Sequence, residues 1–379
     1  MHNYILALYC LLAFHPFSGD DWQTGSATDA GFNEEALARI KADIGEGLFT
    51  NTHSLLIEHD GLLIYEEYFN GSDQRWGVDI GEIQFNANNL HDLRSISKSV
   101  TSMLLGIALE EQFKSKSKSK SKNKKRFEKM LERSVADYFP DVKFDKAHKE
   151  ITLQHLLTMT AGIPWNEVDV PYSKEHNDER LLYLAVDPVE FVLTRELESA
   201  PGKEWVYNGG LTQVAASIIR ELTGKDLTEY AREKLFQPLG ITDFEWLGPG
   251  NWQPSNPAAM SGLRMRPRDL AKLGSLILHQ GKWRKKQIVN EAWVELSTTR
   301  FVQDIGDWSQ GGVYGYGLQW WVGTTRADDK LIAAVGNGNQ RVYILPNSKL
   351  VITIFAGEYG KHEFHSERLL DRVIAAHSQ

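Results

Sequence analysis

Strand signals lie near both ends of the chain and helical signals fill the middle, and this order strongly constrains the fold. Ser54–Glu58 and Leu62–Tyr68 flank Asp60-Gly61, and Asp-Gly predicts a tight hairpin because both turn residues tolerate a positive φ. Towards the other end, the segment 341–355 predicts a second hairpin around Pro346–Lys349. We therefore expect the two ends of the chain to supply the strands of a sheet.

Apolar residues between these hairpins follow a helical spacing. One stripe with i, i+3, i+4, i+7, i+8 spacing consists of Val100, Met103, Leu104, Ile107 and Ala108. Further helices are predicted at Pro188–Leu197, Leu211–Leu222, Leu227–Phe236, Arg268–Gln280, Val289–Leu296 and Glu367–Ala376. These signals favour an α/β (α+β) fold, with an antiparallel sheet built from N- and C-terminal strands, flanked by helices, and an inserted, mostly helical domain. The sheet region is expected at about 50–92 and 310–379, and the helical region at about 93–300.

Charge is unevenly distributed along the chain. The formal net charge of −8 argues against a nucleic-acid partner, because such proteins carry a basic face for phosphates. Lys114–Arg126 nevertheless holds eight positive charges and no apolar residue, so we expect a solvated, mobile loop at 114–126. Binding of this loop to acidic lipid or polymer is the alternative interpretation.

The N-terminal residues include one apolar run, Tyr4–Phe14, which has the length of a signal-peptide core and is too short to span a bilayer. We expect a signal peptide over 1–19 and an exported protein, periplasmic or secreted; a cytoplasmic protein with an apolar N-terminal arm is the alternative. No other segment is long enough to cross a membrane. The single cysteine, Cys10, excludes a disulfide within one chain.

Ser95 and Lys98 stand at the start of the first helical stripe. A serine three residues before a lysine on a helix places both side chains on one face, about one turn apart. Free N–H groups at a helix N-terminus stabilise negative charge there, and a buried lysine with a lowered pKa can take a hydroxyl proton. The alternative is that Ser95 is a plain N-cap and Lys98 a surface charge. The same spacing recurs in the Lys/Ser-rich segment, at Ser115–Lys118, Ser117–Lys120, Ser119–Lys122 and Ser121–Lys124.

Other catalytic motifs are absent from the sequence. It contains no G-x-S-x-G elbow, no H-E-x-x-H, no paired C-x-x-C and no phosphate-binding glycine loop. We therefore expect neither a metal site nor a cofactor.

Six stretches in order resemble the penicillin-recognising serine hydrolases, in the branch related to class C β-lactamases. They are Arg94–Ser102, Ile151–Pro164, Trp205–Gly224, Leu235–Ile241, Ser261–Gly274 and Tyr314–Trp321. The resemblance implies a β-lactamase/transpeptidase-like fold over 20–379, with Ser95 as nucleophile and Lys98 as its proton-handling partner.

The family's second motif is Tyr-x-Asn, and its tyrosine, which helps to move protons, falls on Tyr207. The alternative for Tyr207 is a core aromatic, because it follows Trp205 and Val206. Gly209 occupies the place of the asparagine, and Asn208 stands one residue early. This departure affects the amide that contacts the substrate in antibiotic-binding members.

The third motif, Lys-Thr-Gly or His-x-Gly on a strand at the sheet edge, is replaced here by 334–340. Glycines at 336 and 338 would let a strand backbone approach a substrate closely, although a tight turn is the alternative. The resemblance implies an oxyanion hole made by the backbone N–H groups of Ser95 and Asn337. The segment supplies no cation for a β-lactam carboxylate, so efficient penicillin or cephalosporin hydrolysis is disfavoured. Candidate substrate-binding residues are Trp165, Asn208, Gly336, Gly338, Tyr316 and Trp320.

The expected function is therefore a serine hydrolase that cleaves a small-molecule ester or amide through a Ser95 acyl-enzyme, as a carboxylesterase or a hydrolase of linear amides such as aminohexanoate oligomers. One alternative is a cell-wall D,D-peptidase or β-lactamase-type activity. Another is a non-catalytic binding protein on the same fold. The sequence does not indicate the oligomeric state.

Overall fold

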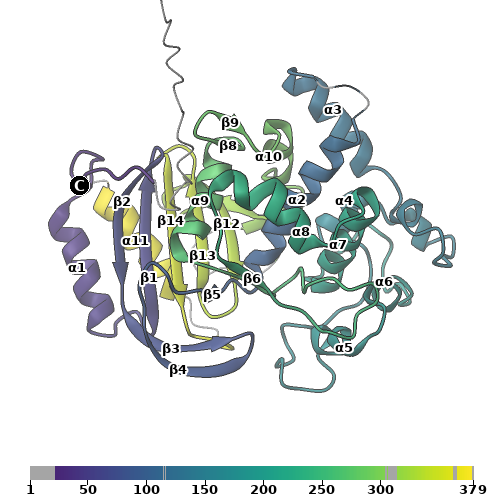
Figure 1. Ribbon diagram of the computed structural model, residues 1–379, viewed down its shortest axis with the longest axis horizontal. Coiled ribbons are helices and arrows are strands. Elements are labelled where there is room, and N and C mark those ends of the chain that lie inside the picture. Colours follow the sequence, from purple (N-terminus) through teal and green to yellow (C-terminus); the bar gives the residue numbers. More distant parts are fainter. Residues whose placement is uncertain are drawn as a thin grey trace, which may run out of the picture.

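The structure is a computed structural model in which a sheet region and a helical region lie side by side (Figure 1). It describes residues 22–113, 115, 117–303, 305, 314–361 and 365–377. The signal peptide predicted at 1–19 lies outside these residues, as does Cys10. In the described part of the chain, no helix combines the length and the apolar character that a bilayer crossing requires.

One seven-stranded antiparallel sheet joins the two ends of the chain. Its strand order is β10-β11-β12-β13-β14-β1-β2, so β1 at the N-terminal side pairs directly with β14 at the C-terminal side. The strands are β1 (Thr52–His59), β2 (Leu62–Tyr68), β10 (Tyr314–Tyr316), β11 (Trp321–Thr324), β12 (Lys330–Gly336), β13 (Gln340–Leu345) and β14 (Leu350–Ala356). The predicted antiparallel sheet built from terminal strands is confirmed.

The turn between β1 and β2 forms as its Asp-Gly sequence predicts. Asp60 and Gly61 have φ values of 48° and 91°, both in the left-handed region that tight hairpin turns use. The Glu58 carboxylate accepts a hydrogen bond of 2.8 Å from the Gly61 N–H, which holds the turn against its own strand. This hairpin fixes the edge of the sheet at β2.

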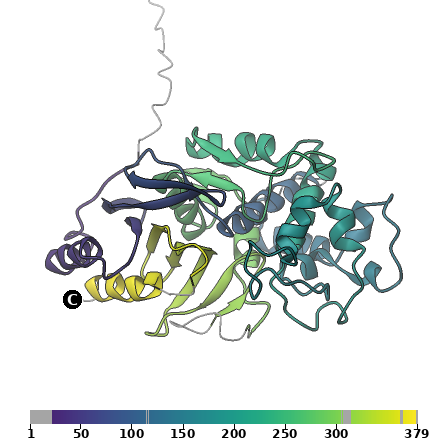
Figure 2. The same ribbon diagram turned by 90° about the horizontal axis from the view of Figure 1, so that it is seen from below.

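Helices cover both faces of the sheet. Val342 and Tyr343 are neighbours on β13, so their side chains point to opposite faces. Val342 packs near Gly274 of α9 (Pro267–Leu278), whereas the Tyr343 hydroxyl lies 3.5 Å from Ser366 of α11 (His365–His377). Helix α1 (Glu34–Gly45) packs against α11, as Figure 2 shows. Every residue of β14 is therefore buried, which agrees with its continuous apolar sequence.

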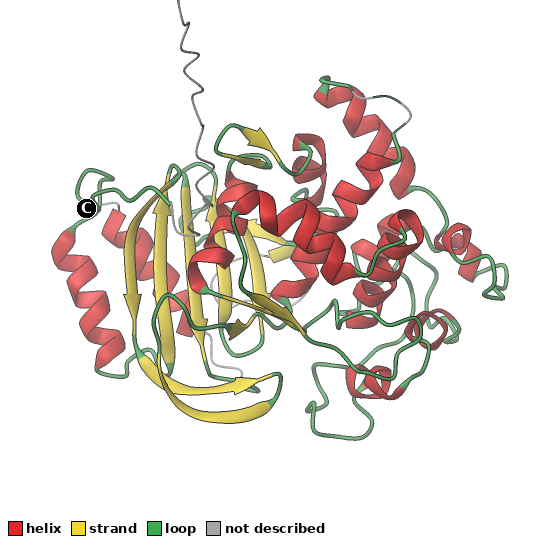
Figure 3. Cartoon of the chain, in the orientation of Figure 1, coloured by secondary structure: helices red, strands yellow, loops and turns green. Residues whose placement is uncertain are grey.

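Most remaining helices gather beside the sheet in the helical region, as Figure 3 shows, where every helix is red. They are α2 (Ile96–Glu111), α3 (Lys120–Leu131), α4 (Leu153–Leu157), α5 (Asp178–Leu184), α6 (Pro188–Leu193), α7 (Gly209–Thr223), α8 (Leu227–Ala231) and α10 (Glu291–Ser297). Helix α2 contacts both α7 and β12, so it lies at the junction of the two regions. It is buried from Ile96 to Leu109, on every face and not only along its predicted stripe.

Short strand pairs complete the architecture around the sheet. They are the hairpin of β3 (Asn70–Arg75) with β4 (Val78–Gln84), the three-stranded set of β5 (His91–Asp92), β7 (Leu263–Met265) and β6 (Phe244–Trp246), and the pair of β8 (Lys282–Trp283) with β9 (Lys286–Gln287). Strand β5 ends just before α2, so its pairing with β7 holds the chain that enters this helix.

The Lys/Ser-rich segment corrects one prediction. We expected a solvated loop at 114–126, but residues 120–126 belong to α3, whose first turn is capped by the Ser119 side chain. Two later residues of the helix, Phe127 and Leu131, are buried and anchor it. Both residues follow the segment, so the sequence pattern of 114–126 does not reveal this anchoring. Positions 114 and 116 are outside the described residues.

Candidate active site

Ser95 stands at the entrance of α2 in an unusual backbone setting. The preceding residue, Arg94, has φ 50°, a left-handed conformation that turns the chain sharply into the helix. Ser95 already has helical φ and ψ, and its side chain makes no hydrogen bond to the backbone of the first turn. The interpretation of Ser95 as a plain N-cap therefore does not fit. Its hydroxyl oxygen instead lies 3.0 Å from the Lys98 ammonium nitrogen.

Lys98 is almost fully buried, with 1% of its surface exposed, so it is not a surface charge. Several oxygen atoms surround its Nζ atom. Ser95 Oγ lies at 3.0 Å, the carbonyl oxygen of Met260 at 3.3 Å and Oε1 of Glu167 at 3.5 Å. The first two accept hydrogen bonds from Lys98, whereas Glu167 Oε1 faces it as an ion-pair partner without a hydrogen bond.

Tyr207 completes this cluster from the segment that leads into α7. Its side chain is 9% exposed and forms hydrogen bonds with both Ser95 and Lys98. The ring centroid lies 4.8 Å from Lys98 Nζ. Burial raises the pKa of Tyr207, and the positive charge of Lys98 opposes that shift. The structure thus brings together the three residues predicted to be catalytic.

Glu167 is a member of the cluster that sequence reasoning missed. Its side chain is fully buried, and Oε2 accepts hydrogen bonds of 2.6 Å from the Trp165 indole and 2.7 Å from the Gly209 N–H. Gly209 is the first residue of α7, where free N–H groups favour an anion. The only local signal was a glutamate two residues after the candidate Trp165.

The charges of the cluster are strongly coupled. Burial favours the neutral amine of Lys98, whereas Tyr207 and the carboxylates of Glu167 and Glu179 favour the ammonium and raise the Lys98 pKa above its usual value. Burial also raises the pKa of Glu167, although Lys98 opposes that shift. A lysine and a carboxylate therefore compete for protons beside the Ser95 hydroxyl.

The end of strand β12 lies close to the turn that carries Ser95. A Cβ atom on Gly336 would lie 2.3 Å from the carbonyl oxygen of Leu93, so only glycine permits this approach. Gly338 has φ 90°, and a Cβ atom there would meet the Tyr359 ring at 2.7 Å. The side chain of Asn337, between them, accepts a 2.9 Å hydrogen bond from the Gly360 N–H. The oxyanion role of the Ser95 and Asn337 N–H groups stays a prediction.

Of the predicted substrate-binding aromatics, Tyr316 belongs to an aromatic cluster beside Tyr207 that also contains Trp205 and Trp321. The Trp205 ring lies 6.1 Å from Tyr207 and 5.7 Å from Tyr316 between centroids. Tyr316 and Trp320 are buried, with 1% and 2% of their surface exposed. Asn208 is also buried, and its side-chain oxygen Oδ1 caps α7 by accepting a hydrogen bond from the backbone N–H of Leu211. Contact of these residues with a substrate stays a prediction.

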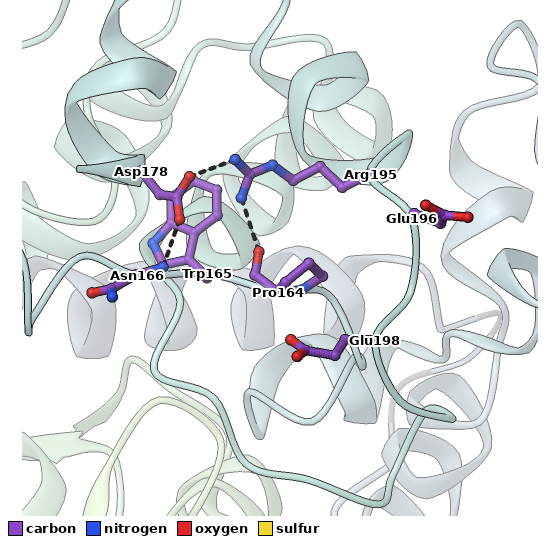
Figure 4. Close-up of a pocket in the computed structure, with 7 residues that line it drawn as sticks. All are labelled: Pro164, Trp165, Asn166, Asp178, Arg195, Glu196 and Glu198. Carbon is purple, nitrogen blue, oxygen red and sulfur yellow. Dashed lines mark hydrogen bonds and ion pairs between the residues drawn. The ribbon is translucent and has the colours of Figure 1, made fainter. Parts of the chain in front are cut away.

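Trp165 also lines a separate surface depression of about 560 Å³ (Figure 4). Arg195 spans this depression, with its guanidinium 4.9 Å from the Trp165 ring and paired to Asp178. Its lining comprises Pro164, Trp165, Asn166, Asp178, Arg195, Glu196 and Glu198. Ser95 and Lys98 are not part of this lining, so Trp165 links the depression to the cluster through its indole bond to Glu167.

A family model described as beta-lactamase matches residues 44–376, which is most of the chain and includes every member of the cluster. The chain belongs to the beta-lactamase family. This membership confirms the resemblance found in the sequence. It also agrees with the sheet and helical regions described above.

Relatives within and around this family include esterases and acyltransferases. A lovastatin esterase from Penicillium rubens is 30% identical over 149 residues, covering 36% of this chain and 33% of the relative. A monacolin J acid methylbutanoyltransferase from Aspergillus terreus is 35% identical over 95 residues, covering 25% and 22%. The matches thus span a third or less of these curated relatives. The structure of EstCE1, a hydrolase with promiscuous acyltransferase activity, superposes with a TM-score of 0.68 at 16% identity, covering 93% of this chain and 100% of EstCE1.

Proposed function

We propose that this chain is a serine hydrolase that cleaves a carboxylic ester, or a linear amide, through an acyl-enzyme on Ser95. One observation carries the proposal. The Ser95 hydroxyl does not cap its helix and instead contacts the amino group of a fully buried lysine at 3.0 Å. A non-catalytic binding protein has no need of a buried lysine beside a serine, because burying that charge is costly.

The mechanism follows from this contact. Ser95 Oγ attacks the substrate carbonyl while Lys98 takes the hydroxyl proton, and backbone N–H groups of Ser95 and Asn337 stabilise the oxyanion. The leaving alcohol or amine receives its proton through Tyr207, which bonds to both Ser95 and Lys98. Water then cleaves the acyl-enzyme.

The substrate class is narrowed by the segment after β12. Residues 336–340 contain no cation that could bind a β-lactam carboxylate. The relatives named above include an esterase, which supports an ester substrate over an antibiotic. A cell-wall D,D-peptidase is the second candidate within the family, and slow acylation of Ser95 by benzylpenicillin would favour it.

The test is the initial rate of p-nitrophenyl butyrate hydrolysis by the wild type and by Ser95→Ala, with circular dichroism to verify that both are folded. We expect turnover in the wild type and none above background in the variant. Turnover retained by Ser95→Ala would refute the proposal. Adding a primary alcohol would show whether the acyl group can also pass to an acceptor other than water.

Export is a separate proposal that rests on the apolar run Tyr4–Phe14. N-terminal sequencing of the protein purified from its host tests it. We expect a mature N-terminus after the run, and an uncleaved N-terminus in the cytoplasm would contradict export.

A further inference from the structure

The contacts of Lys98 pose a problem for its role as a base. Lys98 can take the Ser95 proton only as a free amine, yet its oxygen neighbours and raised pKa are those of an ammonium group. A proton must therefore leave Lys98 before Ser95 can react. An acceptor for that proton has to lie within reach of Nζ.

Glu167 presents an atom suited to this task. Both hydrogen bonds to its carboxylate, from Trp165 and Gly209, go to Oε2. The other oxygen, Oε1, is buried, has no hydrogen-bond partner within the described part of the chain, and lies 3.5 Å from Lys98 Nζ. A modest movement of the lysine side chain would bring the two atoms to hydrogen-bond distance.

Burial brings the two protonation patterns of this pair closer in free energy than they are in water. An ammonium facing a carboxylate and an amine facing a carboxylic acid carry the same net charge, so the exchange leaves no charge uncompensated. Desolvation penalises both charged forms, and it favours the neutral pair more strongly as a substrate excludes water from the site. The two groups therefore titrate together as one unit.

We propose that Lys98 and Glu167 share one proton, and that Glu167 accepts it from Lys98 to make Lys98 the base for Ser95. This inference rests on the proposed hydrolase function. The proton passes from Lys98 Nζ to Glu167 Oε1, and Lys98 then takes the proton of the Ser95 hydroxyl as the bond from Oγ to the carbonyl carbon forms. The carbonyl π pair moves to oxygen and returns as the leaving group departs with a proton from Lys98, relayed by Tyr207.

The cycle closes in deacylation. Water gives one proton to Lys98 as its oxygen attacks the acyl carbon, and that proton returns to Ser95 Oγ when the ester bond breaks. Glu167 then returns its proton to Lys98. Glu167 acts through Lys98 throughout and touches no substrate atom.

Other titratable groups face the pair, and they remain in every Glu167 variant. Glu179 of α5 adds negative charge near both Lys98 and Glu167, and its carboxylate accepts hydrogen bonds from Tyr183 and Ser261. The remaining groups are phenols, which are Tyr207, Tyr172, Tyr183 and Tyr316. Burial raises the pKa of Tyr207, Tyr183 and Tyr316, so these phenols stay neutral near pH 7.

The experiment is the pH dependence of kcat/KM for wild type and Glu167→Gln. In the wild type, the active form, with Lys98 as a free amine and Glu167 protonated, stays available over a broad pH range. Activity falls at low pH only when the pair takes up a second proton, and this step sets the acidic limb of the profile. Glutamine cannot accept a proton, so Lys98 must lose its proton to solvent. We expect the acidic limb of Glu167→Gln to move to higher pH by roughly one unit or more, with about a tenfold lower rate at pH 6.

The opposite shift would overturn the inference. If Glu167 were only a negative charge that keeps Lys98 protonated, its removal would lower the Lys98 pKa and move the limb to lower pH. An unmoved limb would show that Glu167 only supports Trp165 and Gly209. Either result, obtained with a wild type whose turnover depends on Ser95, leaves the proposed function standing. Absence of Ser95-dependent turnover in the wild type would instead remove the function itself.

Two further variants keep the test informative. Glu167→Asp retains a titratable carboxyl, so we expect a lower rate but a limb near the wild-type position; a limb displaced as in Glu167→Gln would count against the shared proton. Glu58→Gln is the matched control, because Glu58 is also buried but belongs to the β1–β2 hairpin, where it bonds to Gly61 and Ser275. Its acidic limb should coincide with that of the wild type.

Discussion

Helices α2 and α3 begin with the same Ser-x-x-Lys spacing and use it in opposite ways. At α2, the Ser95 hydroxyl contacts the Lys98 side chain at 3.0 Å and bonds to no backbone group of the first turn. At α3, the Ser119 hydroxyl accepts a 3.3 Å hydrogen bond from the backbone N–H of Lys122, whose side chain is exposed. One serine is left available for chemistry, and the other is occupied in capping.

The backbone at each helix entrance explains the difference. Ser119 has φ −78° and ψ 113°, the extended conformation from which a side chain reaches back to the first-turn N–H groups. Ser95 has φ −65° and ψ −9°, already helical, because the left-handed Arg94 makes the turn one residue earlier. A short sequence motif therefore becomes a reactive pair only where the preceding turn and the surrounding burial permit it.

The largest contrast should appear in covalent labelling. An alkyl fluorophosphonate should modify Ser95 and none of the serines of the Lys/Ser-rich segment, because Ser95 has a buried amino group beside it and lies at the N-terminus of a buried helix. Mass spectrometry after digestion with a glutamate-specific protease locates the label, since trypsin would cut the Lys/Ser-rich segment into fragments too short to assign. Labelling of Ser117, Ser119 or Ser121 to a similar extent would break the comparison.

The next largest difference should appear when the lysine of each Ser-x-x-Lys motif is replaced by alanine and kcat is measured. Lys98→Ala should lower kcat for p-nitrophenyl butyrate by roughly 10³- to 10⁴-fold, because the proton acceptor for Ser95 is lost. Lys122→Ala is the matched control at the same spacing and should keep wild-type kinetics. Comparable rates for the two variants would mean that Lys98 does not handle the proton.

Tyr207→Phe should have a smaller effect on the α2 site. It removes the hydroxyl that bonds to Ser95 and Lys98 while keeping the ring beside Trp205, so we expect kcat to fall roughly 10²-fold with little change in KM. Steady-state kinetics measure both constants. An unchanged kcat would return Tyr207 to the role of a core aromatic.

The smallest effect should be on stability. Here the α3 serine should matter more than the α2 serine, the reverse of the order expected for activity. Ser119→Ala removes the cap of α3 and should lower the free energy of unfolding by about 1 kcal/mol, as urea denaturation would measure. Ser95→Ala removes no cap, so its cost should be clearly less. A larger loss of stability in Ser95→Ala would show that its hydroxyl supports the fold.

Local patterns predicted most of the fold correctly. The Asp60-Gly61 turn and the spacing from Val100 to Ala108 depend on interactions between near neighbours in sequence, which a pattern can capture. Helix α3 was not predicted because the residues that stabilise it lie outside the Lys/Ser-rich segment. Phe127 and Leu131 lie beyond the segment, and Lys120 and Lys124 form ion pairs with Glu295 of α10.

The candidate site was also predictable only where a local sequence pattern marks its residues. Ser95, Lys98 and Tyr207 followed from a motif and a family resemblance, and the structure brings them together. Glu167 escaped because its partners, Lys98 and the N–H of Gly209, lie far from it in sequence. No spacing rule connects a glutamate to a helix start that comes 42 residues later.

The pairing of β1 with β14 has a consequence during synthesis. The residues that pair lie roughly 300 positions apart, so at about 5–20 residues per second the ribosome needs roughly 15 to 60 s between making one strand and its neighbour. Throughout that interval β1 lacks its partner β14, so the backbone N–H and C=O groups along this edge of the hairpin stay unpaired. Such an edge can pair with other chains and lead to aggregation. A lower growth temperature or chaperone co-expression should therefore improve the yield of folded protein more than a substitution that stabilises the folded state.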